Sequence, residues 1–407
     1  MRLRIKKEEY IPLLILFQNN LILYFSIFLY SVKFTSWLRY SLFPILFVIS
    51  VLINYKWVLS KVTLKSFLFL VVTLLTIFLH YLIFSDNRKY LLDELGNMLW
   101  CVYGGYFFGL AVFDLISNQN ERNWNELYLL SVATLAICIA YSIYTLASGR
   151  VERYVKDGSD MATSFKVLPA LMIICWKGIK TPRLLSIALI IISVIYIISL
   201  GTRGAVIWLI IFMTASMIVY NVHQRKISKW LILFGVMLII AFYFDKILLW
   251  LSDLISRLGL SMRIFNKLTE GSFIVSESRD YISTKVIELI KQNPLYGYGI
   301  LSDRRLIGTY SHNLALEVFL DFGVIAGSII LLWGAYKVIA AFVKAPTLGH
   351  RIFELVLFSS SVGILLSSGS YLFSPLFFVL LAYCDSIIIH SKTKKAKQLY
   401  ASSGGKV

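Results

Sequence analysis

Long apolar runs recur along almost the whole chain, and they restrict what it can fold into. A helix needs about 20 predominantly apolar residues to cross roughly 30 Å of hydrocarbon. Because unpaired backbone groups find no partner in the bilayer core, such runs are predicted to be α-helices. Lys166 and Pro169 interrupt one run, which is the weakest candidate. The candidate stretches are 11–30, 38–55, 66–84, 96–117, 127–147, 165–177, 184–200, 205–221, 230–250, 323–342, 353–370 and 373–389.

The composition also favours a membrane protein over a water-soluble one. Of the 407 residues, 58% are hydrophobic and only 15% are charged, and the mean hydropathy is +0.76. A typical soluble domain has about 25% charged residues. We therefore predict an all-α, polytopic membrane protein of about twelve transmembrane helices.

Lysine and arginine residues gather in clusters that predict the orientation of these helices. If the helices alternate in direction, all the clusters fall on one side, which the positive-inside rule makes cytoplasmic. Both termini are then cytoplasmic. The net charge of +18 is interpreted as this topology signal plus attraction to anionic lipids, not as nucleic-acid binding, because it is scattered over short loops. The clusters are MRLRIKK at the N-terminus, Lys56/Lys61/Lys65, Lys177/Lys180/Arg183, Arg225/Lys226/Lys229, Lys337/Lys344/Arg351 and SKTKKAK at 391–397.

One predicted outer connection, 251–322, is far longer than the others, and long loops in compact proteins are usually functional. Within it, SRDYISTKVIELIKQ has apolar residues on one helical face, and NPLYGYG contains the breakers of a tight turn. The chain is thus predicted to comprise helices at 1–250, a large extracytoplasmic loop at 251–322, helices at 323–390 and a basic cytoplasmic tail at 391–407.

Several kinds of chemistry leave no signature in the sequence. The four cysteines, Cys101, Cys138, Cys175 and Cys384, show neither CxxC spacing nor a nearby pair of histidines, which argues against zinc binding and disulfides. They are interpreted as small apolar packing residues. Gly-rich phosphate loops, GxSxG elbows and HExxH motifs are also absent from the sequence.

Three segments in a fixed order resemble a known family. LGTRGA (200–205), SRDYISTKVIELIKQNPLYGYG (278–299) and SHNLALEVFLDFGVIAG (311–327) are similar to the O-antigen ligase and polymerase superfamily of bacterial envelope enzymes. The resemblance extends from the seventh predicted helix to the eleventh. It implies a membrane glycosyltransferase fold in the bacterial cytoplasmic membrane, with an active site facing outward. It further implies transfer of a glycan from an undecaprenyl pyrophosphate carrier to an acceptor hydroxyl.

Two arginines fit the charge that develops on the departing diphosphate. A guanidinium group is always charged and makes bidentate contacts with phosphate oxygens, which lysine cannot. Arg203 lies between Gly201 and Gly204 at the end of a predicted helix, and Arg279 begins the amphipathic segment. The resemblance implies diphosphate binding by both. From the residues alone, Arg203 could instead snorkel to the membrane interface, and Arg279 could be an ordinary surface charge.

His312 is the only histidine in any predicted outer loop, and its ordinary pKa near 6.5 allows two roles. As a neutral imidazole it could accept the proton of an attacking sugar hydroxyl, and as an imidazolium it could contact diphosphate. Asn313 is predicted to cap the following helix or to orient the imidazole. Glu317, about one turn further on, could orient His312 or act as the base itself, against a plain polar position at a helix end.

Four further arginines could contact glycan or phosphate. They lie in the same predicted loop and comprise Arg257, Arg263, Arg304 and Arg305. We expect no metal or other cofactor, because the predicted outer face lacks a compact Asp/Glu/His cluster and arginines can supply the charge.

The sequence leaves three functions open. A polymerase, which we favour, would pass the growing O-antigen or capsule glycan to another lipid-linked repeat unit. A ligase would pass it to lipid A-core in lipopolysaccharide. A flippase would place its charged residues near the bilayer midplane, whereas here they collect at the predicted outer boundary. The expected partners are the undecaprenyl pyrophosphate-linked oligosaccharide, a glycan acceptor, membrane lipids and a chain-length regulator protein, without nucleic acid.

Overall fold

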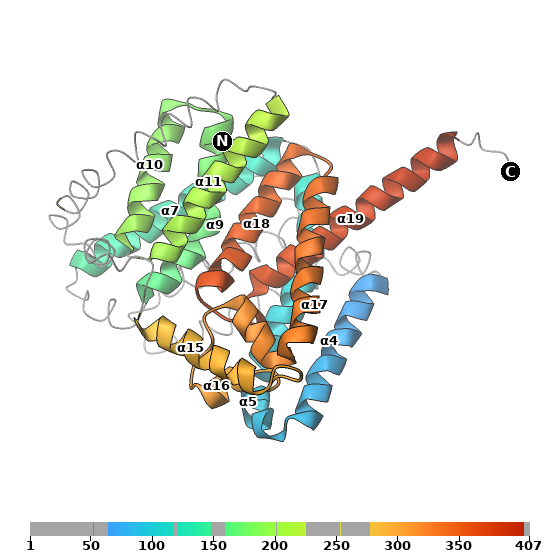
Figure 1. Cartoon of the computed structure of the whole chain (residues 1–407). Helices are drawn as coiled ribbons and strands as arrows, with labels where there is room; N and C mark the ends of the chain where they lie inside the picture. The colour runs from blue at the N-terminus through green and yellow to red at the C-terminus, as the bar shows by residue number, and fades with distance from the viewer. Residues whose placement is uncertain are drawn as a thin grey trace. The chain divides into compact units, whose positions relative to one another are not determined.

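A computed structural model of the chain describes residues 64–117, 121–147, 159–200, 202–224 and 277–402, together with single positions 52 and 253 (Figure 1). Every regular element in these ranges is helical, so the prediction of an all-helical protein is confirmed for them. They fall into two compact units, one formed by 64–117 with 277–402 and the other by the described parts of 121–224. Each unit is considered by itself.

Six helices in the described ranges are long and apolar enough to cross a membrane. A seventh, Leu184–Ile198, is apolar but shorter. This agrees with a polytopic membrane protein, while the number of about twelve spans and the large outer loop stay predictions. The predicted spans 11–30, 38–55 and 230–250 lie outside the described residues. The six candidate spans are Ser66–Ile83, Asn123–Ala140, Gly204–Gln224, Leu314–Lys344, Leu348–Ser367 and Pro375–Thr393.

The unit within 121–224 is arranged around one buried helix. α9 (Ser159–Lys180) contacts the other three helices of the unit, and its residues from Val167 to Trp176 are almost fully buried. Helix α9 includes Pro169 and extends beyond the run at 165–177, which the sequence indicates only weakly. The hydroxyl of Ser164 donates to the hydroxyl of Thr202 over 2.9 Å. The surrounding helices are α7 (Glu121–Ala147), α10 (Leu184–Ser199) and α11 (Arg203–Gln224).

The other unit brings early and late parts of the chain together. Its first part comprises α4 (Leu64–Ile83), η2 (Ser85–Asn87), α5 (Arg88–Leu99), the π-helical turn η3 (Trp100–Gly104) and α6 (Gly105–Ser117). Its second part comprises α15 (Glu277–Gln292), α16 (Ser302–Leu306), α17 (Leu314–Lys344), α18 (Leu348–Ser367), η4 (Tyr371–Phe373) and α19 (Pro375–Ser402).

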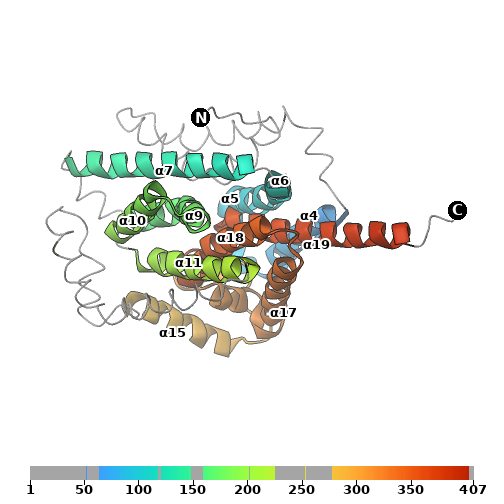
Figure 2. The same ribbon diagram turned by 90° about the horizontal axis from the view of Figure 1, so that it is seen from above.

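Helix α19 packs closely along α6. Its C-terminal part extends past α6 and α18 in Figure 2. Gly105 and Gly109 make this approach feasible. A Cβ atom at Gly105 would lie 2.5 Å from the carbonyl oxygen of Pro375, and one at Gly109 would lie 2.6 Å from that of Val379. Small residues four apart let two helix backbones approach each other closely.

Helix α17 is broken at Gly323, whose backbone dihedral angles are φ 77° and ψ 170°. The turn 293–299, which carries the NPLYGYG motif, packs against the break. The amide of Tyr298 donates to the carbonyl of Leu320 over 2.7 Å, and the amide of Val324 donates to the carbonyl of Pro294, also over 2.7 Å. The turn thus supplies hydrogen-bond partners for backbone groups of α17 that have no partner within the helix at the break. The predicted span 323–342 begins at this break, whereas the helix itself begins at Leu314.

Candidate active site

His312 lies at a strained corner just before α17. Its φ angle is +58°, in the left-handed region that residues other than glycine rarely adopt. The ring centroid of Tyr310 lies 4.0 Å from that of His312. The Nδ1 atom of His312 is buried and has no hydrogen-bond partner among the described residues. Strained backbone of this kind clusters at functional sites.

The surroundings of His312 disfavour a positive charge on its ring. Burial, and after it the positive charge of Arg279, lower the pKa of His312 to about 4. The imidazole is therefore neutral near pH 7, with a nitrogen lone pair that can accept a proton. Of the two roles considered for His312, this favours the base over the imidazolium contact.

The residues on both sides of His312 are held by hydrogen bonds. The buried carboxylate of Asp303 accepts from the amide of Ser311 over 3.1 Å. The side-chain oxygen of Asn313 accepts from the amides of Ala315 and Leu316 over 2.9 and 3.2 Å and so caps α17. An N-cap of this kind satisfies amides that have no partner within the helix.

Three buried carboxylates surround one arginine beneath this corner. Asp303, Glu317 and Asp321 are each at most 1% exposed. The Nη1 atom of Arg304 donates to both oxygens of Asp303, over 2.6 and 2.7 Å, and to Glu317 Oε1 over 3.4 Å. Burial opposes the charge of Arg304, but Asp303, Glu317 and Asp321 together outweigh this effect and raise the pKa of the guanidinium above its usual value. The guanidinium carbon lies 5.1 Å from the ring centroid of Phe373.

Glu317 also binds the connection between α18 and α19. The hydroxyl of Ser370 donates to Oε1 of Glu317, and the amide of Tyr371 donates to Oε2 over 3.1 Å. The hydroxyl of Tyr371 donates to Asp321 over 2.9 Å. Burial first, and then the charge of Asp321, raise the pKa of Tyr371 well above its ordinary value, so this hydroxyl stays a donor. The hydrogen bonds described for the Glu317 side chain lead to Arg304, Ser370 and Tyr371 and not to His312.

The other predicted site residues lie in different surroundings. Arg279 is half-buried near the start of α15 and acts electrostatically on His312. Arg305 donates from Nε to the side-chain oxygen of Asn87 over 2.7 Å and thereby holds α16 to η2. Arg203 is the first residue of α11, in the other unit, and its side chain lies outside the described structure. Arg257 and Arg263 lie outside the described residues.

The sequence did not indicate four members of this cluster, namely Asp303, Asp321, Ser370 and Tyr371. Asp303 follows no recognised motif, Ser370 is the last residue of the predicted span 353–370, and Tyr371 lies in a predicted connection of only two residues. Ser370 and Tyr371 meet Glu317 from more than fifty positions further along the chain. A usable signal was the polar SGSY (368–371) between two predominantly apolar runs. Within the described part of the chain, no group of three or more His, Cys, Asp or Glu residues could hold a metal ion.

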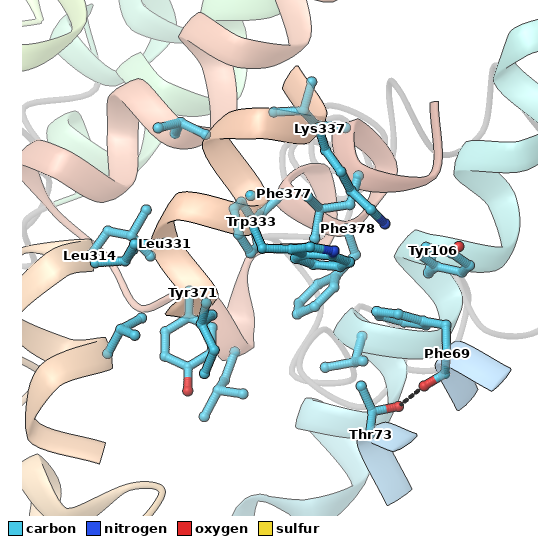
Figure 3. A pocket seen from close by; sticks show the side chains of 18 of the residues that line it. Phe69, Thr73, Tyr106, Leu314, Leu331, Trp333, Lys337, Tyr371, Phe377 and Phe378 are labelled. Carbon is cyan, nitrogen blue, oxygen red and sulfur yellow. Dashed lines mark hydrogen bonds between the residues drawn. The ribbon is translucent and has the colours of Figure 1, made fainter. Parts of the chain in front are cut away.

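A large apolar cavity borders the cluster, with a volume of about 1440 Å³. Its walls come from α4, α6, α17, α18 and α19, and residues such as Phe69, Leu331 and Phe377 line it. Figure 3 shows Leu314 and Tyr371 on one side and Phe69 and Tyr106 on the other. Because Tyr371 also donates to Asp321, the cavity extends up to the polar cluster.

A polar group also lies within the cavity wall. The ammonium of Lys337 lies 2.7 Å from the carboxylate of Asp385, which also accepts from the hydroxyl of Tyr106 over 2.8 Å. Ionisable residues within membrane segments pair with one another in this way. The rest of the wall is mainly aliphatic and aromatic, so the cavity suits a long apolar chain.

Comparison with known proteins gives one positive result. No curated protein and no solved structure matches the chain. Residues 187–331 match the family model described as O-antigen ligase. The matched range contains Arg203, Arg279, His312 and Glu317, and it ends within α17. Residues 187–331 are thus similar to the O-antigen ligase family, which supports the superfamily that the three motifs resemble.

Proposed function

We propose that the protein is a membrane glycosyltransferase that polymerises a bacterial surface polysaccharide, such as O-antigen or capsule. It would transfer a glycan from undecaprenyl pyrophosphate to a hydroxyl of another lipid-linked repeat unit. The observation that carries this proposal is His312, a neutral imidazole on strained backbone beside Arg279. The superfamily supports it at a coarser level, because it implies a membrane glycosyltransferase-like enzyme of the ligase or polymerase type.

The proposed reaction uses His312 as general base. Its neutral ring accepts the proton of the acceptor hydroxyl while the oxygen attacks the anomeric carbon of the donor. The bond from that carbon to the diphosphate oxygen breaks, and undecaprenyl pyrophosphate leaves with the electron pair. Arg279 and Arg203 would stabilise the charge on the diphosphate, so no metal or other cofactor would be needed. Diphosphate bound to Arg279 would also offset the charge that lowers the pKa of His312 and strengthen the base.

The apolar cavity supports a donor carried on a lipid. Its wall of aliphatic and aromatic side chains suits a polyprenyl tail, and its border at Tyr371 would hold the tail next to the polar cluster. We propose that the site faces outward from the bacterial cytoplasmic membrane, with both termini cytoplasmic, as the basic clusters predict. Membrane lipids, a glycan acceptor and a chain-length regulator protein would be its partners.

The proposed function can be tested with purified protein in lipid vesicles. With a lipid-linked repeat unit as the only saccharide, we expect a ladder of longer glycans on the carrier and release of undecaprenyl pyrophosphate. A ligase would produce no ladder and would transfer glycan only after a lipid A-core acceptor is added. Movement of the lipid-linked sugar across the bilayer without release of carrier would instead identify a flippase and contradict the proposal.

Replacing the proposed diphosphate-binding arginines by lysine should not be conservative. Arg279→Lys and Arg203→Lys keep the positive charge but lose the planar guanidinium group that can donate two parallel hydrogen bonds to phosphate. Each variant should therefore lose most of its glycan transfer while the protein still accumulates in the membrane. Glycan ladders and donor affinity measure the effect. Lys291→Gln provides a matched control, because this lysine is exposed at the far end of α15. Wild-type ladders from both lysine variants would contradict bidentate binding.

A further inference from the structure

The conformation of His312 requires support from its neighbours. A histidine in the left-handed region stores strain on the order of 1–3 kcal/mol, which persists only where surrounding contacts enforce it. Asn313 provides one contact by capping α17. On the other side, the amide of Ser311 donates to Asp303, whose side chain is completely buried.

Asp303 is itself fixed by Arg304. The guanidinium contacts both carboxylate oxygens, and the Arg304 amide donates to Oδ1 over 2.9 Å. The same Nη1 atom reaches Glu317, which holds the connection before η4 through Ser370 and Tyr371. The pair therefore joins three chain segments, namely α16, the His312 corner and the connection between α18 and α19.

The charges around Arg304 argue against a role in binding the donor. Its single positive charge lies among the carboxylates of Asp303, Glu317 and Asp321, two of which hydrogen bond to it directly. The buried Asp303 carboxylate already accepts two hydrogen bonds from this guanidinium, so a diphosphate would have to compete with it for Arg304. These contacts suit Arg304 to holding neighbouring chain segments together and not to binding the phosphate of the donor.

We propose that the Asp303–Arg304 pair is a positioning device that holds the imidazole of His312 in its catalytic orientation, and that Glu317 extends this device and is not the base. The inference depends on the proposed role of His312 as general base. If the Ser311 amide lost its acceptor, the corner could relax and the ring would move. A misplacement of about 1 Å in an active site can cost on the order of 10²-fold in rate.

Three single variants and one double variant at Asp303 and Arg304 test this positioning role. Asp303→Leu removes the acceptor, and its single-turnover rate should fall on the order of 10²-fold with unchanged donor affinity. Asp303→Asn keeps an oxygen for the Ser311 amide and should retain much more activity. Arg304→Gln alone should also slow the reaction, because it leaves the buried carboxylates without their cation. Adding Asp303→Asn to it should recover part of the rate, since two amides can pair.

Opposite outcomes would overturn the proposal. If Arg304→Gln weakens donor affinity and leaves the single-turnover rate unchanged, Arg304 is a phosphate contact. Wild-type rates for Asp303→Leu would show that the Ser311 contact is dispensable. Should Asp303→Leu fail to accumulate, the comparison of Arg304→Gln with the double variant decides the matter, because a phosphate ligand would not be rescued by Asp303→Asn.

Hydrogen exchange separates this inference from the proposed function. Positioning predicts faster exchange of the Ser311 amide in Asp303→Leu than in the wild type, whether or not the protein transfers glycan. Slower exchange at Ser311, or none of the predicted increase, would contradict positioning even in an active polymerase. If exchange of the Ser311 amide is faster in Asp303→Leu but His312→Ala retains the full rate, His312 is not the base. The Asp303–Arg304 pair would then still be shown to hold the corner at Ser311 and His312.

Discussion

His312→Ala is expected to slow the chemical step about 10²–10⁴-fold while donor affinity stays close to that of the wild type. The imidazole is neutral because burial and Arg279 lower its pKa to about 4, so its loss removes a base and not a cation. Arg279 and Arg203, which are proposed to bind the diphosphate, are unchanged in this variant. Single-turnover rates measured beside donor affinity separate the two effects.

The left-handed backbone at position 312 requires a matched variant. Alanine is strained at a φ angle of +58°, whereas asparagine adopts this region several-fold more often than most residues. His312→Asn should therefore fold at least as well as His312→Ala and be similarly slow. If His312→Asn or His312→Gln retains nearly full activity, hydrogen bonding or backbone shape was sufficient. An unchanged rate with weakened donor affinity would favour a diphosphate contact instead.

The pH dependence of the rate follows from the same lowered pKa. Only the neutral form of His312 accepts a proton. We therefore expect kcat/KM to fall as the pH drops through about 4, which is the pKa of His312 in the protein without substrate. Arg279 contributes to this low value by disfavouring the imidazolium. Its replacement in Arg279→Gln should raise the pKa of His312 and move the acid limb of the residual activity to higher pH.

Gly323→Ala should strongly destabilise the protein. The φ and ψ angles of 77° and 170° belong to a region that only glycine readily adopts, at a cost on the order of 1–3 kcal/mol for other residues. A Cβ atom there would also overlap the carbonyl oxygen of Leu295. The clash adds to the strain and would push the 293–299 turn away from α17. We expect lower accumulation and a clearly lower melting temperature in detergent.

Gly334→Ala is the matched control in the same helix. A Cβ atom at Gly334 meets nothing within 4 Å among the described residues. Alanine is about 1 kcal/mol better than glycine inside a helix, so this variant should be neutral or slightly stabilising. Equal melting temperatures for the two variants would show that the turn does not depend on Gly323.

The helical elements near the site could be predicted from local patterns. The apolar face of SRDYISTKVIELIKQ indicates a helix, and α15 covers Glu277–Gln292. The breakers in NPLYGYG indicate a turn, which the structure places at 293–299. Both signals arise within a few neighbouring residues. The predicted span at 323–342 missed the first part of α17 because charged Glu317 and Asp321 lower its hydropathy.

The polar cluster could not be predicted, because its contacts join distant parts of the chain. From the sequence, Glu317 is expected at a solvent-exposed helix end. In the structure it is buried and accepts hydrogen bonds from Ser370 and Tyr371, more than fifty positions away. Arg304 and Arg305 look equivalent in sequence, but one binds buried Asp303 and the other Asn87 in η2. Pairings of this kind depend on how α17, η2 and η4 pack, which local periodicity does not encode.

The turn at 293–299 is attached to α17 through main-chain atoms at Pro294, Tyr298 and Gly299. By contrast, the side chains of Leu295 and Tyr296 are 56% and 77% exposed. Amide and carbonyl groups are the same in every residue except proline, so exchanging the side chains at 295 and 296 leaves these bonds in place. Evolution can therefore vary the chemistry displayed beside the candidate active site without rebuilding the architecture beneath it.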